Sequence, residues 1–294
     1  MNYPEPNIRV KVDVTNPGQF FACCGLLELA DRLWPGVEGW FDKNQFLVSI
    51  RECKPADIDA IKLFESFTKA EIQNSMTVPQ IERRNYLSSK KAKDRTSEDN
   101  EEKKQLDKLW RESAIVLDSF GLIIDWFKNK ENGGSVFKTW AGQQSVIDIF
   151  LAMKESLVTH NECFNEMNCL NWLFESINND QVPFYFDSAL SKQGSSVDLG
   201  FGLDSLKMSS SIRPMIEYLA FIGLQRFRPS KTTQKNVFVY SAWKTPVTVL
   251  LASALCSKTI NSFEGDDCEF SLLYRTDYLK SFLPAKRLSK SNKL

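Results

Sequence analysis

The chain has 294 residues with 37 basic and 37 acidic side chains, so its formal net charge is zero. This balance argues against a protein that coats nucleic acid with its whole surface, although it allows a local basic groove. Hydrophobic residues make up 43% and charged residues 25%, which is typical of a globular protein with a core of normal size. At ~150 residues per domain, the length fits one α+β domain over 1–294, or two closely packed lobes over about 1–130 and 131–294.

Aromatic residues are abundant, with 21 Phe, 7 Trp and 7 Tyr. We interpret most of them as parts of a large aromatic core. The alternative is that some are stacking platforms for unpaired bases.

The cysteines and the apolar runs predict a soluble, cytoplasmic protein. The seven Cys include no Cys-x-x-Cys pair and follow no secretory leader, which indicates reduced, buried thiols. The best apolar run is interrupted by Glu28, Asp31 and Arg32, so it falls short of the ~18 residues that a membrane span needs. We therefore expect no membrane contact.

The first elements have clear local signals. Residues 8–14 alternate apolar and polar side chains, which predicts a half-buried strand. Asn16 is a suitable helix N-cap, because Pro17 follows at the first helical position and Gln19 lies three residues after the cap. We expect a helix with almost no polar face from there to about Trp34.

A hairpin over 40–50 and a helix over 54–72 follow. Residues 88–105 are highly charged and almost free of apolar side chains, so they cannot pack a core. We predict a mobile charged loop over 88–105, or the frayed start of a helix. Apolar residues between 106 and 116 then predict a helix.

The second half mixes strands and helices without strict alternation. A strand is favoured over a buried helix at 119–127, and 247–256 is compatible with either. The remaining expected elements are helices over 145–158, 162–177 and 211–229, strands over 182–187, 236–243 and 269–278, and a Gly/Ser/Asp-rich loop over 191–206. This order predicts an α+β fold with mainly antiparallel sheets packed by several helices.

Gly25 and Gly223 each lie among bulky residues of an apolar helix. Glycine in a helix costs about 1 kcal/mol relative to alanine, so each glycine indicates close packing against another backbone. We predict that both helices are central to the core. Both helices could then pack against the same sheet.

Catalytic signals are weak. His160 is the single histidine, so a Ser-His-Asp or Cys-His arrangement would have to use it, and a surface or capping role is favoured. Five residues separate Cys163 from Cys169 and no second pair follows, which disfavours zinc. We expect no cofactor and no metal.

Three aspartates leave a second hypothesis open. Asp187, Asp198 and Asp204 are candidates to bind Mg²⁺ in a metal-dependent nuclease, provided that they converge. The alternative is ordinary turn chemistry, because a Gly/Ser loop that contains aspartates is usually a set of turns.

Basic residues mixed with aromatics are the strongest chemical signal. After the helix that ends near 226, guanidinium groups can bind phosphates and a Phe can stack on a base. Before the helix at 145–158, a Lys and a Trp precede a helix N-terminus, which attracts phosphate. The alternative is that these are helix-capping cations and packing aromatics. The predicted nucleic-acid surface consists of Lys138, Trp140, Arg226, Phe227, Arg228, Lys231 and Lys235.

Four motifs resemble a known family. They are VTNPGQFFA (14–22) running into GLLELA (25–30), KTWAG (138–142), PFYFD (183–187), and EYLA (217–220) running into GLQRFRP (223–229). With these, the chain resembles the Csb-family proteins of type I-U (also called I-G) CRISPR systems, and the third member of the Csb group is the best match. The resemblance covers most of the chain, and 88–105 is its least characteristic part.

The resemblance implies a non-catalytic subunit of a CRISPR effector complex that contributes to antiviral defence. Its expected partners are other effector subunits and guide RNA, target DNA or both, because such subunits hold backbones while base pairing reads sequence. It also implies either an RNA-recognition-like (ferredoxin-like) core with helical insertions or a large-subunit-like role. The resemblance transfers no catalytic residue. The alternatives are the nuclease that uses Asp187, Asp198 and Asp204, and a structural adaptor that contacts only protein.

Overall fold

The computed structural model describes residues 3–50, 60–74, 76–128, 134–140, 144–179, 182–189, 210–260, 263–274 and 280–289. In this part of the chain the fold is α+β, and every strand pairing is antiparallel, as predicted. None of the helices described is both long and apolar enough to cross a membrane.

The first sheet contains half of the expected ferredoxin-like core. Its strands are β1 (Ile8–Lys11), β2 (Glu38–Asp42), β3 (Gln45–Ser49) and β11 (Val247–Thr248), in the order β1-β3-β2-β11. Strand β3 lies between β1 and β2 and pairs with both, as in a split β-α-β-β unit. The fourth strand, β11, pairs with β2, whereas a ferredoxin-like order places it beside β1 at the opposite edge.

The second sheet is built from the C-terminal part of the chain, in the order β13-β12-β10-β9, with β14 also paired to β12. Its strands are β9 (Ser230–Lys231), β10 (Val237–Trp243), β12 (Gly265–Tyr274), β13 (Lys280–Phe282) and β14 (Lys286–Arg287). Two smaller sheets consist of β4 (Ile72–Gln73), β5 (Ile115–Leu117) and β6 (Leu122–Ile124), and of β7 (Ile177–Asn179) and β8 (Ser210–Ile212).

Helix α1 (Pro17–Leu33) begins where the sequence predicts. The Asn16 side chain accepts a hydrogen bond from the Gln19 backbone N–H at 3.4 Å, and Pro17 occupies the first turn. The Gln19 side chain does not return to Asn16 but accepts from the Asp13 backbone N–H at 2.7 Å. The cap therefore ties the helix to the chain that follows β1.

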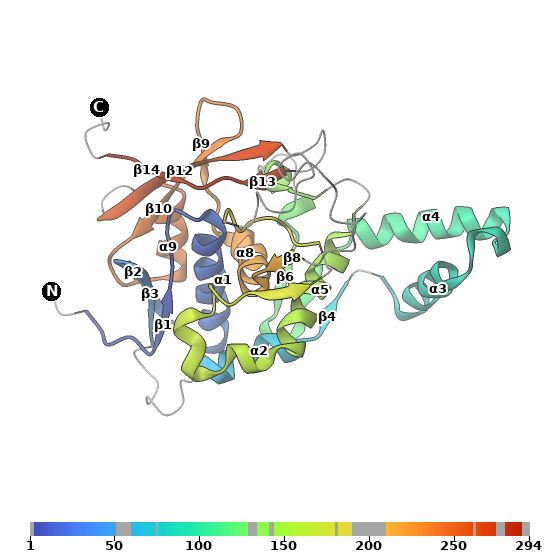
Figure 1. Cartoon of the computed structure of the whole chain (residues 1–294), viewed down its shortest axis with the longest axis horizontal. Helices are drawn as coiled ribbons and strands as arrows, with labels where there is room; N and C mark the ends of the chain where they lie inside the picture. The colour runs from blue at the N-terminus through green and yellow to red at the C-terminus, as the bar shows by residue number, and fades with distance from the viewer. Residues whose placement is uncertain are drawn as a thin grey trace.

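Helix α1 lacks a polar face because it packs against both large sheets (Figure 1). The Phe20 ring stacks on Phe41 of β2 and on Tyr240 of β10, with ring centres 5.2 and 4.2 Å apart. The Phe21 ring contacts Phe270 of β12 edge-on at 6.2 Å. One helix thus joins the two sheets into a continuous aromatic core.

Helix α8 (Pro214–Arg226) crosses α1 at the two glycines (Figure 1). A Cβ on Gly25 would lie 2.0 Å from the Leu219 carbonyl oxygen, and a Cβ on Gly223 would lie 2.1 Å from the Phe21 carbonyl oxygen. The predicted backbone contact and the central position of both helices are confirmed. On its other side α8 packs against α5 (Val146–Thr159), where the Tyr218 and Phe150 rings stack at 4.6 Å.

Of the two alternatives for 88–105, the loop is wrong from residue 97 onward, and a helix that starts within this stretch is confirmed. Helix α3 (Val78–Ser89) and helix α4 (Ser97–Glu112) form a hairpin that projects from the body of the molecule (Figure 1). The charges that argued against structure pair across this hairpin, with Arg83 2.6 Å from Glu102 and Lys90 2.7 Å from Asp99. Asp99 also closes a capping box with Thr96, so α4 begins within the stretch predicted as a loop.

Three other predicted elements differ. Residues 162–177 contain 3₁₀ turns (Asn161–Phe164 and Glu166–Asn171) instead of an α-helix. Residues 182–187 form no regular strand, because Tyr185 adopts a positive φ of 63° that interrupts an extended run. In the stretch 119–127 only β6 is a strand.

The stretch 247–256, whose sequence is compatible with a helix or a strand, forms helix α9 (Val249–Cys256). The helix predicted over 54–72 corresponds to α2 (Ala60–Lys69). The start of that prediction and the loop predicted over 191–206 lie outside the described residues.

We predict that Gly25→Ala lowers the free energy of unfolding by about 3 kcal/mol or more, because the new methyl group meets rigid backbone. The same methyl group in an open helix would instead stabilise by about 1 kcal/mol. Chemical denaturation measures the change. Gly39→Ala is the control, since its methyl group meets only side-chain atoms of Leu27 and Phe46 and should cost less. A stabilised Gly25→Ala protein would contradict the crossing.

Candidate nucleic-acid interface

In the basic segment at the end of α8, the side chains of Arg226, Phe227 and Arg228 contact the protein interior. The Arg226 guanidinium forms an ion pair with Glu28, with Nη2 3.1 Å from Oε1, and this hydrogen bond raises the pKa of Arg226. Glu28 is only 2% exposed and also accepts from Arg32 Nε at 3.0 Å. Arg226 therefore neutralises a buried carboxylate, which gives it a structural role, and its predicted phosphate contact stays a prediction.

Phe227 and Arg228 are also structural. Phe227 is fully buried and lies parallel to Trp243, with ring centres 6.1 Å apart, so it cannot stack on a base. The Arg228 guanidinium lies 5.8 Å from the Trp126 ring centre and donates to the Gln225 carbonyl at 3.3 Å. Burial lowers the pKa of Arg228 to about 10. These contacts give both side chains a role in packing, and the predicted nucleic-acid contact of Phe227 and Arg228 stays a prediction.

Lys231 and Lys235 are the exposed cations of this segment. Lys231 lies in β9, which pairs with the buried strand β10 at Phe238, and Lys235 lies in the turn between the two strands.

The other predicted segment, which contains Lys138 and Trp140, lines a pocket. The Trp140 ring is buried and does not present a face on which a base could stack. Trp140 is 5% exposed and packs edge-on against Trp126 and Phe184, with ring centres 5.9 and 5.4 Å apart. Lys138 is half-buried, with Nζ 5.6 Å from the Trp140 ring centre. The tryptophan therefore supplies an apolar wall, and the lysine lies beside it.

Lys138 and Trp140 line a cavity of about 730 Å³, which we call the basic pocket. Four of its lining residues are cations from three separate segments, and one is an acid. The lining residues are Lys108, Arg111 and Glu112 of α4, Phe127 and Lys128 of a 3₁₀ turn, Lys138 and Trp140 before α5, and Gln144 and Val146 next to its N-terminus.

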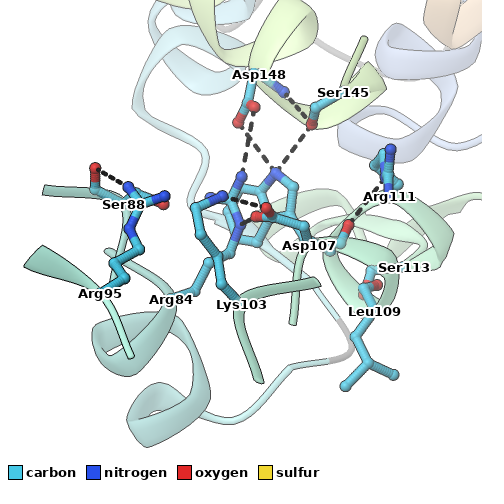
Figure 2. Close-up of polar contacts among 11 residues, drawn as sticks. Arg84, Ser88, Arg95, Lys103, Asp107, Leu109, Arg111, Ser113, Ser145 and Asp148 are labelled. Atoms are coloured by element: carbon cyan, nitrogen blue, oxygen red, sulfur yellow. Dashed lines mark hydrogen bonds and ion pairs between the residues drawn. The ribbon is translucent and has the colours of Figure 1, made fainter. Parts of the chain in front are cut away.

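A polar network fixes α4 beside α5. The Trp110 indole N–H is shared between Ser145 Oγ at 2.9 Å and Asp148 Oδ1 at 3.0 Å. Figure 2 shows Asp107 between Arg84 and Lys103, and Asp148 with Ser145 on the neighbouring helix. Trp110 thus sets the position of the last turn of α4, which carries Lys108 and Arg111.

The same network leaves the pocket positive. Burial opposes ionisation of Asp107, but the bonds from Lys103 and Arg84 prevail and hold its pKa below the usual value. Arg111 Nε donates to the backbone carbonyl of Asp107 at 3.1 Å. In the part of the chain that the structure describes, Lys108 and Lys128 form no ion pair. Arg84 and Lys103 therefore neutralise Asp107, and among the lining residues Glu112 is a single acid beside four cations.

Of the three aspartates in the nuclease hypothesis, the structure describes only Asp187. Asp187 is 1% exposed, and its oxygens accept from Asn16 Nδ2 at 2.6 Å, from the Ala189 N–H at 3.0 Å and from Arg213 Nη1 at 3.2 Å. It joins the starts of α1 and α8. Among the residues described, no group of three or more His, Cys, Asp or Glu could hold a metal ion. Asp198 and Asp204 lie outside the described residues.

His160 ends α5, and its Nδ1 lies 3.1 Å from the Ser156 carbonyl oxygen. This is the capping role that the sequence favours.

The sequence reasoning missed Lys108, Arg111 and Lys128. A signal was present, because Lys104, Lys108 and Arg111 have the i, i+4, i+7 spacing of one helix face. It was hidden by neighbouring acids, whose pairing with Arg84 and Lys103 only the fold reveals.

We predict that the free energy of unfolding falls between about pH 5 and pH 8 because of Glu217 in α8. Burial raises the pKa of Glu217 to about 8, while bonds from the backbone N–H groups of Asp187 and Phe186 oppose the shift. Folded protein then retains a proton that unfolded protein has lost, so stability decreases by up to ~1.4 kcal/mol per pH unit.

Denaturation at several pH values measures this slope. Glu217→Gln should flatten it, and Glu82→Gln, at an exposed position of α3, should not. An unchanged slope in the Glu217→Gln protein would contradict the assignment.

The comparisons give no further guidance: no protein-family model, no curated protein and no solved structure matches this chain.

Proposed function

We propose that the chain is a non-catalytic, cytoplasmic subunit of a type I-U CRISPR effector complex, and that it holds guide RNA or target DNA by its phosphates. The observation that carries the nucleic-acid part is the convergence of four cations from three segments on the basic pocket. The membership in the complex, with other effector subunits as partners, is supported by the four sequence motifs that resemble the Csb family.

The lining chemistry suits a phosphodiester backbone. Arg111 offers a planar fork of donors and Lys108, Lys128 and Lys138 offer compact charges, and both kinds of group bind phosphate oxygens. The edges of Phe127 and Trp140 give the pocket an apolar wall that a sugar or base edge can contact. Such contacts position a backbone without reading its sequence, which agrees with base pairing as the source of specificity.

The two other hypotheses have less support. A metal-dependent nuclease would need the oxygens of Asp187, which already accept hydrogen bonds from Asn16, Ala189 and Arg213. A protein-only adaptor would have no use for four cations gathered around a concave site.

Binding should depend on the basic pocket and not on the turn after β9. We expect the double variant Lys128→Ala/Lys138→Ala to bind a labelled single strand about tenfold or more weakly, and to lower the slope of log K against log salt by ~1.4. Fluorescence anisotropy at several salt concentrations measures both quantities.

Lys231→Ala/Lys235→Ala is the matched control, because it removes two exposed cations elsewhere and should leave binding unchanged. The opposite pattern, with binding lost only in the control pair, would place the interface after β9 and contradict the pocket.

The proposed membership in an effector complex needs a separate experiment. We expect the tagged chain, purified from its native cells, to bring down other effector subunits together with guide RNA. Recovery of the chain alone under gentle salt conditions would contradict membership in an effector complex.

A further inference from the structure

A line of cations leads out of the basic pocket along α4. Lys104, Lys108 and Arg111 lie at i, i+4 and i+7, so their side chains share one face of the helix. Lys104 and Lys108 are exposed, and within the described residues neither forms an ion pair. Glu101, one turn before Lys104, is the first acid beyond this line.

The spacing of these cations matches a nucleic-acid backbone. At 1.5 Å per residue, Lys104 and Arg111 are about 10 Å apart along the helix axis. Successive phosphates of a stacked strand are separated by ~3.4 Å along its axis, so this line is long enough for roughly three phosphates. Lys128 and Lys138 continue the charge inside the pocket.

Three acids of α4 pair with cations outside this line. Asp99 and Glu102 pair with Lys90 and Arg83 of α3, and Asp107 pairs with Arg84. The base of the hairpin is also fastened to α5 through Trp110, so the line and the pocket keep a fixed relation.

We infer that a single-stranded nucleic acid occupies the basic pocket and continues outward along Lys108 and Lys104 of α4. The inference rests on the proposed function and adds the strandedness of the ligand, its path and a further binding residue, Lys104. A single strand fits because the pocket has the volume of a small-molecule site, about 730 Å³, with cations on several sides. A flexible strand can bend into such a cavity, whereas the paired strands of a duplex cannot.

The experiment measures anisotropy of the full chain with labelled 12-nucleotide RNA and DNA strands, a 4-nucleotide strand and a 12-base-pair duplex. We expect the single strands to bind at least tenfold more tightly than the duplex. Lys104→Ala should weaken binding of the 12-nucleotide strands about fivefold and lower the salt slope by ~0.7, without affecting the 4-nucleotide strand. Lys138→Ala should weaken both lengths.

Lys93→Ala is the control, since it removes an exposed lysine at the far end of the same hairpin and should change nothing. If Lys138→Ala weakens binding but Lys104→Ala does not, the path along α4 is wrong while the proposed function stands. If the unmodified chain binds no strand, both fail. If the duplex binds as tightly as the single strands, the inferred preference for a single strand is wrong. If a 12-residue polyglutamate peptide competes equally well, nucleic acid is not the ligand.

Discussion

The contact between Gly25 and Gly223 is the constraint on which the rest of the structure depends. Because neither glycine has a side chain, α1 and α8 approach to backbone distance. The carbonyl oxygens of Leu219 and Phe21 then occupy the space that a Cβ would need. Helix α1 then fills the space between two sheets, and α8 presents its other side to Trp126, Phe127 and Trp140. The Trp126 indole N–H donates to the Phe221 carbonyl at 2.9 Å. The crossing therefore also sets the apolar wall of the basic pocket.

Burial decides which cations of this neutral chain are available for binding. Arg226 offsets the buried Glu28, and Arg228 lies against Trp126 with its pKa lowered to about 10 by burial. Lys108 and Lys128 line a cavity beside which Asp107 is already paired with Arg84. Two groups of similar composition thus have different roles, one in the stability of the core and the other in the proposed binding of phosphate.

Features with a local physical cause could be predicted from the sequence, and features that depend on distant partners could not. Asn16 caps α1, and the two glycines mark a helix crossing, because each conclusion needs only the residue and its neighbours. The α3–α4 hairpin depends on pairs such as Arg83 with Glu102, nineteen residues away. The roles of Phe227 and Trp140 depend on burial, which a mixed basic and aromatic stretch does not reveal. Of the predicted surface, Lys138 and Trp140 belong to the basic pocket. The position of Lys108 in this pocket could be identified only from the fold.

The central claim is that nucleic acid lies in the basic pocket and along α4. Photocrosslinking tests it most directly: a 12-nucleotide strand with 4-thiouridine at defined positions is irradiated with the full chain, and the crosslinked peptides are sequenced by mass spectrometry. The account predicts crosslinks within 104–111 and 127–140, with the order of the nucleotides matching their path from pocket to helix. Crosslinks confined to 230–236, or scattered without order over the surface, would contradict it.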